Sequence, residues 1–183
     1  MKISYDCEFL EDGTSIRLIS IGMVREDGKK LYRVVDDQDL IDDVMKHEWL
    51  RKNVIPSLPI VIFSNGEWDW DLLNPDIHSL QPKYRIAEDV KRFITDTPSP
   101  ELWAYYGAYD HVALCQLFGR MVDLPMGIPM YTNDIKSELV RLNLIVPEQT
   151  AGKHNALSDA QWNMETLNLI RERTFISYFR EKE

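Results

Sequence analysis

The first part of the chain alternates between apolar and polar positions with the two-residue period that is typical of β-strands. Ile3 to Leu10, Ser15 to Val24 and Lys30 to Val35 each have the length and composition of a strand. The connecting segments Glu11 to Thr14 and Asp27-Gly28 carry turn residues, with a glycine available for a positive φ. The pattern predicts an antiparallel three-strand meander at the start of the fold.

Farther along the chain the pattern changes to the longer period of helices. One further strand is expected at Leu102 to Tyr106, and no assignment is made for the proline-rich stretch Pro56 to Pro82. Helices are expected at Asp39 to Trp49, Tyr84 to Thr95, Tyr109 to Phe118, Asn133 to Leu142 and Leu157 to about Phe175. Strands, then helices, then strand–helix alternation are typical of an α/β or α+β domain with a mixed sheet.

The length of 183 residues suits a single domain, which we place at residues 1–175, with a frayed charged tail at 176–183. A hydrophobic content of 44% and a charged content of 28% are ordinary for a soluble globular protein. No stretch approaches the roughly 20 apolar residues of a membrane span, and no secretory signal is recognisable. Cys7 and Cys115 are interpreted as reduced thiols. We therefore expect a cytoplasmic protein without a membrane partner.

The formal net charge of −9 argues against a broad basic surface for extended nucleic-acid binding. An enzyme that holds divalent cations with clustered carboxylates is also acidic before the ions arrive. The charge therefore leaves room for local contacts to one strand end. Lys83 to Arg85 and Lys91-Arg92 are candidates for such contacts, with an ordinary solvated helix face as the alternative.

Two carboxylates, Asp6 and Glu8, are separated by one residue in the first predicted strand. Side chains at i and i+2 of a strand point to the same face, so these carboxylates project side by side while Cys7 points into the core. Like charges this close favour a cation between them, and oxygen ligands suit Mg²⁺ or Mn²⁺. Asp6 and Glu8 lie in an apolar core strand. The similar pairs Asp37/Asp39 and Asp69/Asp71 do not, and they are interpreted as surface carboxylates.

Asp110 follows an apolar strand and a glycine turn, at the start of the next predicted helix. Taken alone, it is an ordinary acid at a helix N-terminus. The alternative is that it faces the same sheet edge as Asp6 and Glu8.

His154 lies on the loop before the last helix, and Asp159 lies in that helix's first turn. A loop histidine beside a metal cluster is placed to take a proton from water. The alternative is an exposed loop histidine beside a first-turn acid. His47, His78 and His111 are given no catalytic role.

The order Asp6-x-Glu8, then Asp110, then His154-x-Ala156-x-x-Asp159 resembles the DEDDh 3′–5′ exonuclease superfamily. The chain is most similar to small single-domain bacterial and phage exoribonucleases, including a mycobacterial member. The segments that carry this closer similarity are Tyr5 to Gly13, Leu18 to Gly22, Glu101 to Ala104 and Gly107 to Leu117. The resemblance implies an RNase H-like α/β fold, in which a three-strand meander and strand–helix units form a mixed five-stranded sheet flanked by helices.

The resemblance also implies an activity: hydrolysis of phosphodiester bonds from the 3′ end of single-stranded RNA, releasing nucleoside 5′-monophosphates by a two-metal-ion mechanism. Asp6, Glu8, Asp110 and Asp159 would hold two Mg²⁺ ions, for which Mn²⁺ can substitute. His154 would be the general base, so activity is expected to fall as acidification protonates the imidazole.

The chain departs from many members directly after the first motif, where Phe9-Leu10 replaces a Thr-Gly-type segment near the terminal nucleotide. We expect Phe9 or Leu10 to bind the substrate by packing on the last base, since stacking tolerates any base. Core packing of Phe9 is the alternative.

Three other functions are weighed: a DNA 3′–5′ exonuclease, a catalytically silent nucleic-acid-binding module of the same fold, and a metal-independent glycosidase with two carboxylates. No residue identified from the sequence is placed against a 2′-OH, so the RNA preference comes from the resemblance alone. Members of this group can be homodimers. The segment Trp68 to Leu73 is a candidate interface, with packing on its own core as the alternative.

Overall fold

The computed structural model describes residues 1–146 and 148–180, with the backbone alone for 175–180. Within these residues the central sheet has the strand order β6-β3-β2-β1-β7-β8. The strands are β1 (Lys2–Glu11), β2 (Ile16–Arg25), β3 (Lys30–Val35), β6 (Leu80–Gln81), β7 (Glu101–Ala104) and β8 (Asn133–Asp134). β1, β2 and β3 form the predicted antiparallel meander, and β7 and β8 continue the sheet in parallel. The mixed sheet is therefore confirmed, with the two-residue β6 as a sixth strand beyond the five expected.

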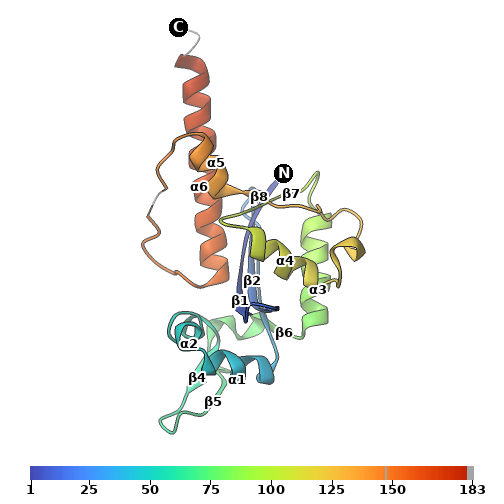
Figure 1. The fold of residues 1–183 in the computed structure, drawn as a ribbon, viewed down its shortest axis with the longest axis vertical. Helices are drawn as coiled ribbons and strands as arrows, with labels where there is room; N and C mark the ends of the chain where they lie inside the picture. The colour runs from blue at the N-terminus through green and yellow to red at the C-terminus, as the bar shows by residue number, and fades with distance from the viewer. Residues whose placement is uncertain (147, 181–183) are drawn as a thin grey trace.

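Helices cover both faces of the sheet (Figure 1). One face packs against α3 (Lys83–Thr95) and α4 (Ala108–Gln116), which contribute buried residues to the main hydrophobic core. The other face packs against α5 (Ile135–Arg141) and the long α6 (Ala156–Arg180) through a second apolar cluster. The hydroxyl of Ser4 donates to the carbonyl of Ala160 at 2.7 Å, which ties β1 to α6. Because side chains alternate along β1, Asp6 and Glu8 also face the α6 layer, up to the register shift between Glu8 and Phe9.

The predicted helix at Asp39 to Trp49 is two helices, α1 (Gln38–Lys46) and α2 (Glu48–Asn53). His47 between them has the extended backbone of φ −89° and ψ 108°, which ends α1 and starts α2. Its imidazole Nδ1 accepts from the Leu50 N–H, so it caps the second helix. Apolar periodicity continues across the break, which explains why the pattern predicted one helix.

The stretch without a sequence assignment contains a small hairpin, β4 (Ile60–Ile62) and β5 (Trp68–Trp70), between the short 3₁₀ helices Ile55–Ser57 and Pro75–Ser79. Trp68 donates its indole N–H to Asp42 at 2.7 Å and contacts Trp70 edge-on. Both tryptophans pack against the main core.

The backbone of residues 176–180, part of the predicted frayed tail, continues α6, and residues 181–183 lie outside the described residues. None of the helices in the described part of the chain combines the length and apolarity that crossing a bilayer requires.

Gly22 of β2 is in direct contact with the start of α6. A Cβ atom at this position would overlap the backbone of Ala156 and Leu157. The glycine therefore lets the helix N-terminus lie against the sheet, which sets the position of everything in the first turn of α6.

Replacing Gly22 by alanine is expected to destabilise the protein by about 3 kcal/mol, because backbone rather than a flexible side chain must move. Urea unfolding followed by circular dichroism measures the change. The exposed Glu101→Ala on β7 is the control and should stay within about 0.5 kcal/mol of wild type. A Gly22→Ala protein as stable as that control would refute the close contact.

Candidate active site

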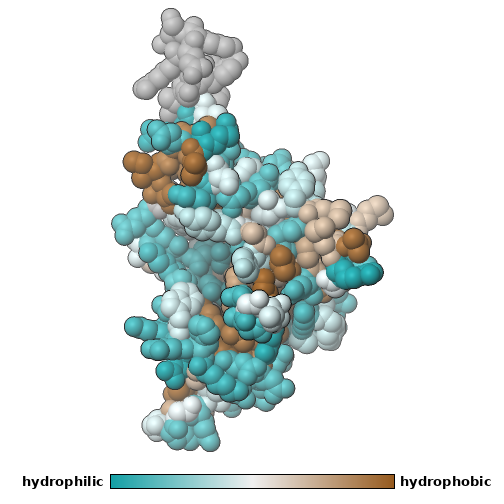
Figure 2. Space-filling view, in the orientation of Figure 1, coloured by the Kyte–Doolittle hydropathy of each residue, from teal (hydrophilic) through white to brown (hydrophobic). Residues whose placement is uncertain are grey.

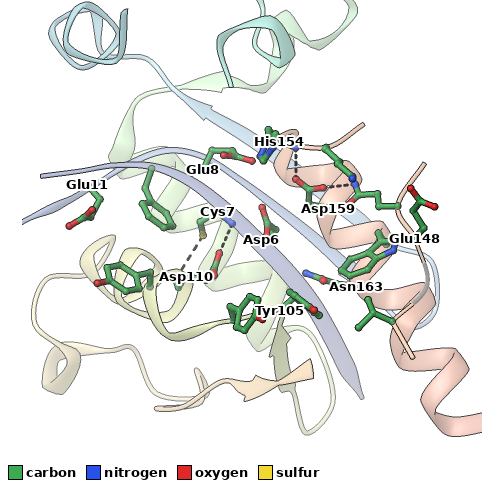
Figure 3. A pocket seen from close by; sticks show the side chains of 17 residues that line it. Asp6, Cys7, Glu8, Glu11, Tyr105, Asp110, Glu148, His154, Asp159 and Asn163 are labelled. Carbon is green, nitrogen blue, oxygen red and sulfur yellow. Dashed lines mark hydrogen bonds between the residues drawn. The ribbon is translucent and has the colours of Figure 1, made fainter. Parts of the chain in front are cut away.

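Three carboxylates converge where β1 meets the first turn of α6 (Figure 3). Asp6 and Glu8 point from β1 toward α6, as the strand alternation predicts, and Asp159 points back from the helix. Each offers one oxygen such that the three atoms lie within 4.8 Å of one another. Glu8 is 8% exposed, and Asp6 and Asp159 are half-buried, so the cluster is partly withdrawn from solvent. The local strand is irregular, with a register shift between Glu8 and Phe9.

Asp110 stands beside this cluster, in the first turn of α4. Gly107 is the residue that precedes the helix, so Asp110 is not its N-cap. Instead, one oxygen of its carboxylate accepts from the Cys7 N–H of β1 at 2.8 Å, and the residue is only 6% exposed. This bond holds the N-terminus of α4 to the strand that carries Asp6.

The electrostatics of the cluster show like charges held together away from water. Burial, followed by the charges of Asp110, Glu8 and Asp159, raises the pKa of Asp6 well above its ordinary value. Burial, followed by the charges of Asp159 and Asp110, raises the pKa of Glu8 to about 8, and burial raises that of Asp110 to about 7. The pKa of Asp159 is also raised, chiefly by burial. Such a set of hard oxygen donors suits a divalent cation, which would favour the ionised carboxylates.

His154 is fixed at the edge of the cluster by contacts to three separate parts of the chain. Its backbone N–H donates to one oxygen of Asp159 at 2.8 Å, and its backbone carbonyl accepts from the Ser57 hydroxyl at 2.6 Å. Its imidazole packs edge-on against Trp49 with ring centroids 4.8 Å apart. The backbone has a φ of 62°, a left-handed conformation that is costly outside glycine and is found at functional sites. The other oxygen of Asp159 accepts from Gln149 at 2.5 Å.

These side chains open into a cavity of about 800 Å³. Figure 2 shows the surface hollowed between α6 and α4, with hydrophobic residues gathered over the loop after α5 and over the segment after α4. All five motif residues line the cavity, and so does Phe9. Leu10 is not among the lining residues and packs against the main core. Lys153 is the only lysine or arginine among the described residues that line it.

The family model described as the 3'-5' exoribonuclease Rv2179c-like domain matches residues 1–171. The chain belongs to this family.

The Rv2179c-like family includes relatives of nearly equal length. The 3'-5' exoribonuclease Rv2179c of Mycobacterium tuberculosis, strain ATCC 25618 / H37Rv, is 36% identical over 173 residues, which cover 93% of both chains. The 3'-5' exoribonuclease MT2234.1 of strain CDC 1551 / Oshkosh gives the same values. A solved structure of exonuclease I matches with a TM-score of 0.51 at 10% identity, covering 98% of this chain and 43% of that one. This last likeness shows the RNase H-like fold alone.

Among the residues that contact His154 and Asp159, sequence reasoning missed Trp49, Ser57 and Gln149. Gln149 precedes the His154 motif by only a few positions, so its nearness could have indicated it. Trp49 and Ser57 lie in a distant segment, and no local pattern links them to His154.

Two of the other histidines have structural contacts. His47 caps α2, and His111 contacts Thr132 and the carbonyl of Met130 at 3.0 Å each.

Proposed function

We propose that this chain is a 3′–5′ exoribonuclease that hydrolyses phosphodiester bonds at the 3′ end of single-stranded RNA and releases nucleoside 5′-monophosphates. The observation that carries the proposal is the convergence of Asp6, Glu8 and Asp159 within 4.8 Å, beside Asp110 and His154. Membership of the Rv2179c-like family supports the same reaction class.

We further propose a DEDDh metal centre with two Mg²⁺ ions, for which Mn²⁺ can substitute. Asp6, Glu8 and Asp159 would hold the first ion, and Asp6 and Asp110 the second. The support is the all-oxygen donor set and the raised pKa values of these carboxylic acids. When bound, the ions would stabilise charge on the attacking and leaving oxygens of the phosphodiester.

The proposed reaction also needs a proton acceptor and a contact to the terminal base. His154 would accept the proton of the attacking water, with its orientation held by Asp159, Ser57 and Trp49. Phe9 would pack on the terminal base, which its place in the cavity wall supports. Leu10 packs in the core and finds no such support.

The test uses a 5′-labelled single-stranded RNA and the same sequence as DNA, each with Mg²⁺ and with EDTA. A Mg²⁺-dependent ladder that shortens from the 3′ end, absent with Asp6→Ala, is the expected result. Faster cleavage of DNA would favour the DNA exonuclease alternative. No cleavage of either strand with Mg²⁺ or Mn²⁺ would overturn the proposal and favour a silent binding module.

Replacing His154 by alanine is expected to lower kcat by roughly 10²- to 10⁴-fold, because the attacking water loses its proton acceptor. Single-turnover hydrolysis of the labelled RNA measures the loss. His78→Ala is the matched control, since His78 is exposed and lies outside the cavity lining. Full activity of the His154 variant would end the general-base assignment.

We also propose that residues 1–175 form one domain, which the family match over residues 1–171 supports. A cytoplasmic location is proposed because both cysteines, Cys7 and Cys115, are free and buried. A homodimer through residues 68–73 would use the exposed Leu72 and Leu73, because Trp68 and Trp70 pack on their own core. Light scattering after gel filtration would test it.

A further inference from the structure

Two groups of aromatic side chains line the catalytic cavity. The Phe9 pair consists of Phe9 from β1 and Tyr109 from α4, stacked with ring centroids 6.0 Å apart and planes at 14°. The Tyr105 cluster consists of Tyr105, Tyr106 and Trp162, in which Tyr105 meets the other two rings edge-on at 4.8 and 5.2 Å. Each group presents ring surface on which a nucleobase can stack.

The two groups lie on different sides of the carboxylates. In Figure 3, Glu11, which is in the same strand as Phe9, lies on one side of Asp6. Asn163, the neighbour of Trp162 in α6, lies on the other side. A strand whose scissile phosphate sits at Asp6 therefore has an aromatic surface on each side of that phosphate.

Two buried polar atoms in and beside the Tyr105 cluster have no hydrogen-bond partner among the described residues. They are the indole N–H of Trp162 and the side-chain oxygen of Asn163. Asn163 is 1% exposed, and its amide nitrogen donates to the Tyr5 carbonyl at 3.1 Å, which fixes the amide orientation. The accessible area of each of these two atoms is below 1 Å², so both are enclosed by the protein and the contact to a base comes from the aromatic rings that line the cavity.

The position of Tyr106 is strained and tightly held. Its φ of 56° is unusual for a bulky residue, and such outliers cluster at functional sites. The next residue, Gly107, donates its N–H to the Asp134 carboxylate at 3.0 Å. A Cβ atom on Gly107 would lie 2.8 Å from the Cβ of Ala104, so the turn packs closely on β7. This packing and the hydrogen bond hold the backbone of the turn that carries Tyr106 beside the cavity.

The charges around the cavity increase the importance of stacking. The acidic lining residues are Asp6, Glu8, Glu11, Asp110, Glu148 and Asp159. Against them Lys153 is the only lysine or arginine among the described lining residues. Side-chain attraction for the phosphates is therefore small, and contacts to the bases must supply much of the binding free energy of the strand.

We propose that the Tyr105 cluster binds the base of the nucleotide that precedes the 3′-terminal one, while the Phe9 pair holds the terminal base. This inference rests on the proposed function. Phe9 is the residue proposed above for the terminal base, so the aromatic surface on the other side of Asp6 is left for the base before it. Tyr106 is 64% exposed, so the strand can continue past it into solvent.

The test combines a protein variant with substrates that lack one base, in the manner of a double-mutant cycle. Tyr106→Asn removes the ring and keeps a residue that tolerates positive φ. With an intact RNA oligonucleotide, this variant is expected to lose roughly 10-fold in kcat/KM. With an abasic site at the penultimate nucleotide, wild type and variant should be equal. With an abasic site at the terminal nucleotide, the roughly 10-fold difference should persist.

Two control variants separate stacking from folding. Tyr106→Phe keeps the ring and should restore the dependence on the penultimate base. Tyr131→Ala removes a ring of similar exposure, 66%, that lies outside the cavity lining, and it should leave kcat/KM unchanged. Two outcomes would overturn the subsite. In the first, Tyr106→Asn still lowers kcat/KM when the penultimate base is missing; in the second, its effect disappears when the terminal base is missing instead.

Binding of the same labelled oligonucleotides, followed by fluorescence anisotropy with Ca²⁺ in place of Mg²⁺, distinguishes this inference from the proposed function. Base-dependent binding without hydrolysis in Mg²⁺ would leave the subsite standing and refute the exonuclease. Hydrolysis without the base dependence would refute the subsite alone.

Discussion

Replacing Asp6 by asparagine is expected to lower kcat for RNA hydrolysis by at least roughly 10³-fold, while the protein stays folded. Asp6 is the carboxylate that both proposed ions share, so its loss affects the whole site. Burial and three neighbouring acids already penalise its charge in the absence of metal. The neutral amide of the same shape removes that penalty, so the metal-free variant should be at least as stable as wild type.

The combination of lost activity and retained stability is the diagnostic result. Rapid-quench hydrolysis of labelled RNA gives kcat, and thermal unfolding in EDTA at pH 8 gives Tm. Asp71→Asn, at one of the surface carboxylates set aside from the sequence, is the control and should change neither quantity. Activity within tenfold of wild type in Asp6→Asn would remove this residue from the metal centre.

Without divalent ions, the protein is expected to lose stability as the pH rises from about 5 to 8. The pKa of Glu8 is raised to about 8 and that of Asp110 to about 7, so the folded state holds protons that the unfolded state has released near pH 4. The folded state then binds more protons than the unfolded state across this window, and the free energy of unfolding falls with pH. Each group contributes at most about 1.4 kcal/mol per pH unit.

Divalent ions should reverse this trend, because they favour the ionised carboxylates that the metal-free fold penalises. The rise in Tm on adding Mn²⁺ or Mg²⁺ is expected to be larger at pH 8 than at pH 5. Thermal scans in EDTA and in excess metal at both pH values measure it, with Asp6→Asn as the variant that should show a reduced shift. A metal-induced shift that is the same at both pH values would contradict metal binding by these carboxylates.

Strand alternation explains how much of the site could be predicted. It placed Asp6 and Glu8 on one face of β1, and the structure puts that face opposite α6. The RNase H-like mixed sheet followed from the meander and the motif order, and the family match confirms the recognition. The position of Asp159 in the first turn of the last helix could be predicted because the start of a long helix is visible in the local sequence.

The remaining features depend on contacts between distant segments. β6 and β8 have two residues each, too few for any period to be visible. Asp110 resembled a plain helix cap, and only the fold shows that its partner is the Cys7 N–H. The contacts of Trp49 and Ser57 with His154 join residues about 100 positions apart, which no local pattern reports.

The long separation between Asp6 and Asp159 has a consequence for the newly made protein. Ribosomes deliver the chain from its N-terminus, so Asp6 and Glu8 emerge about 150 residues before Asp159. β1 can pair with β2 at once, but its polar face stays uncovered until α6 arrives. A nascent chain that has not yet reached Asp159 therefore lacks one of the three converging carboxylates, and the proposed metal centre can form only after the start of α6 has been made.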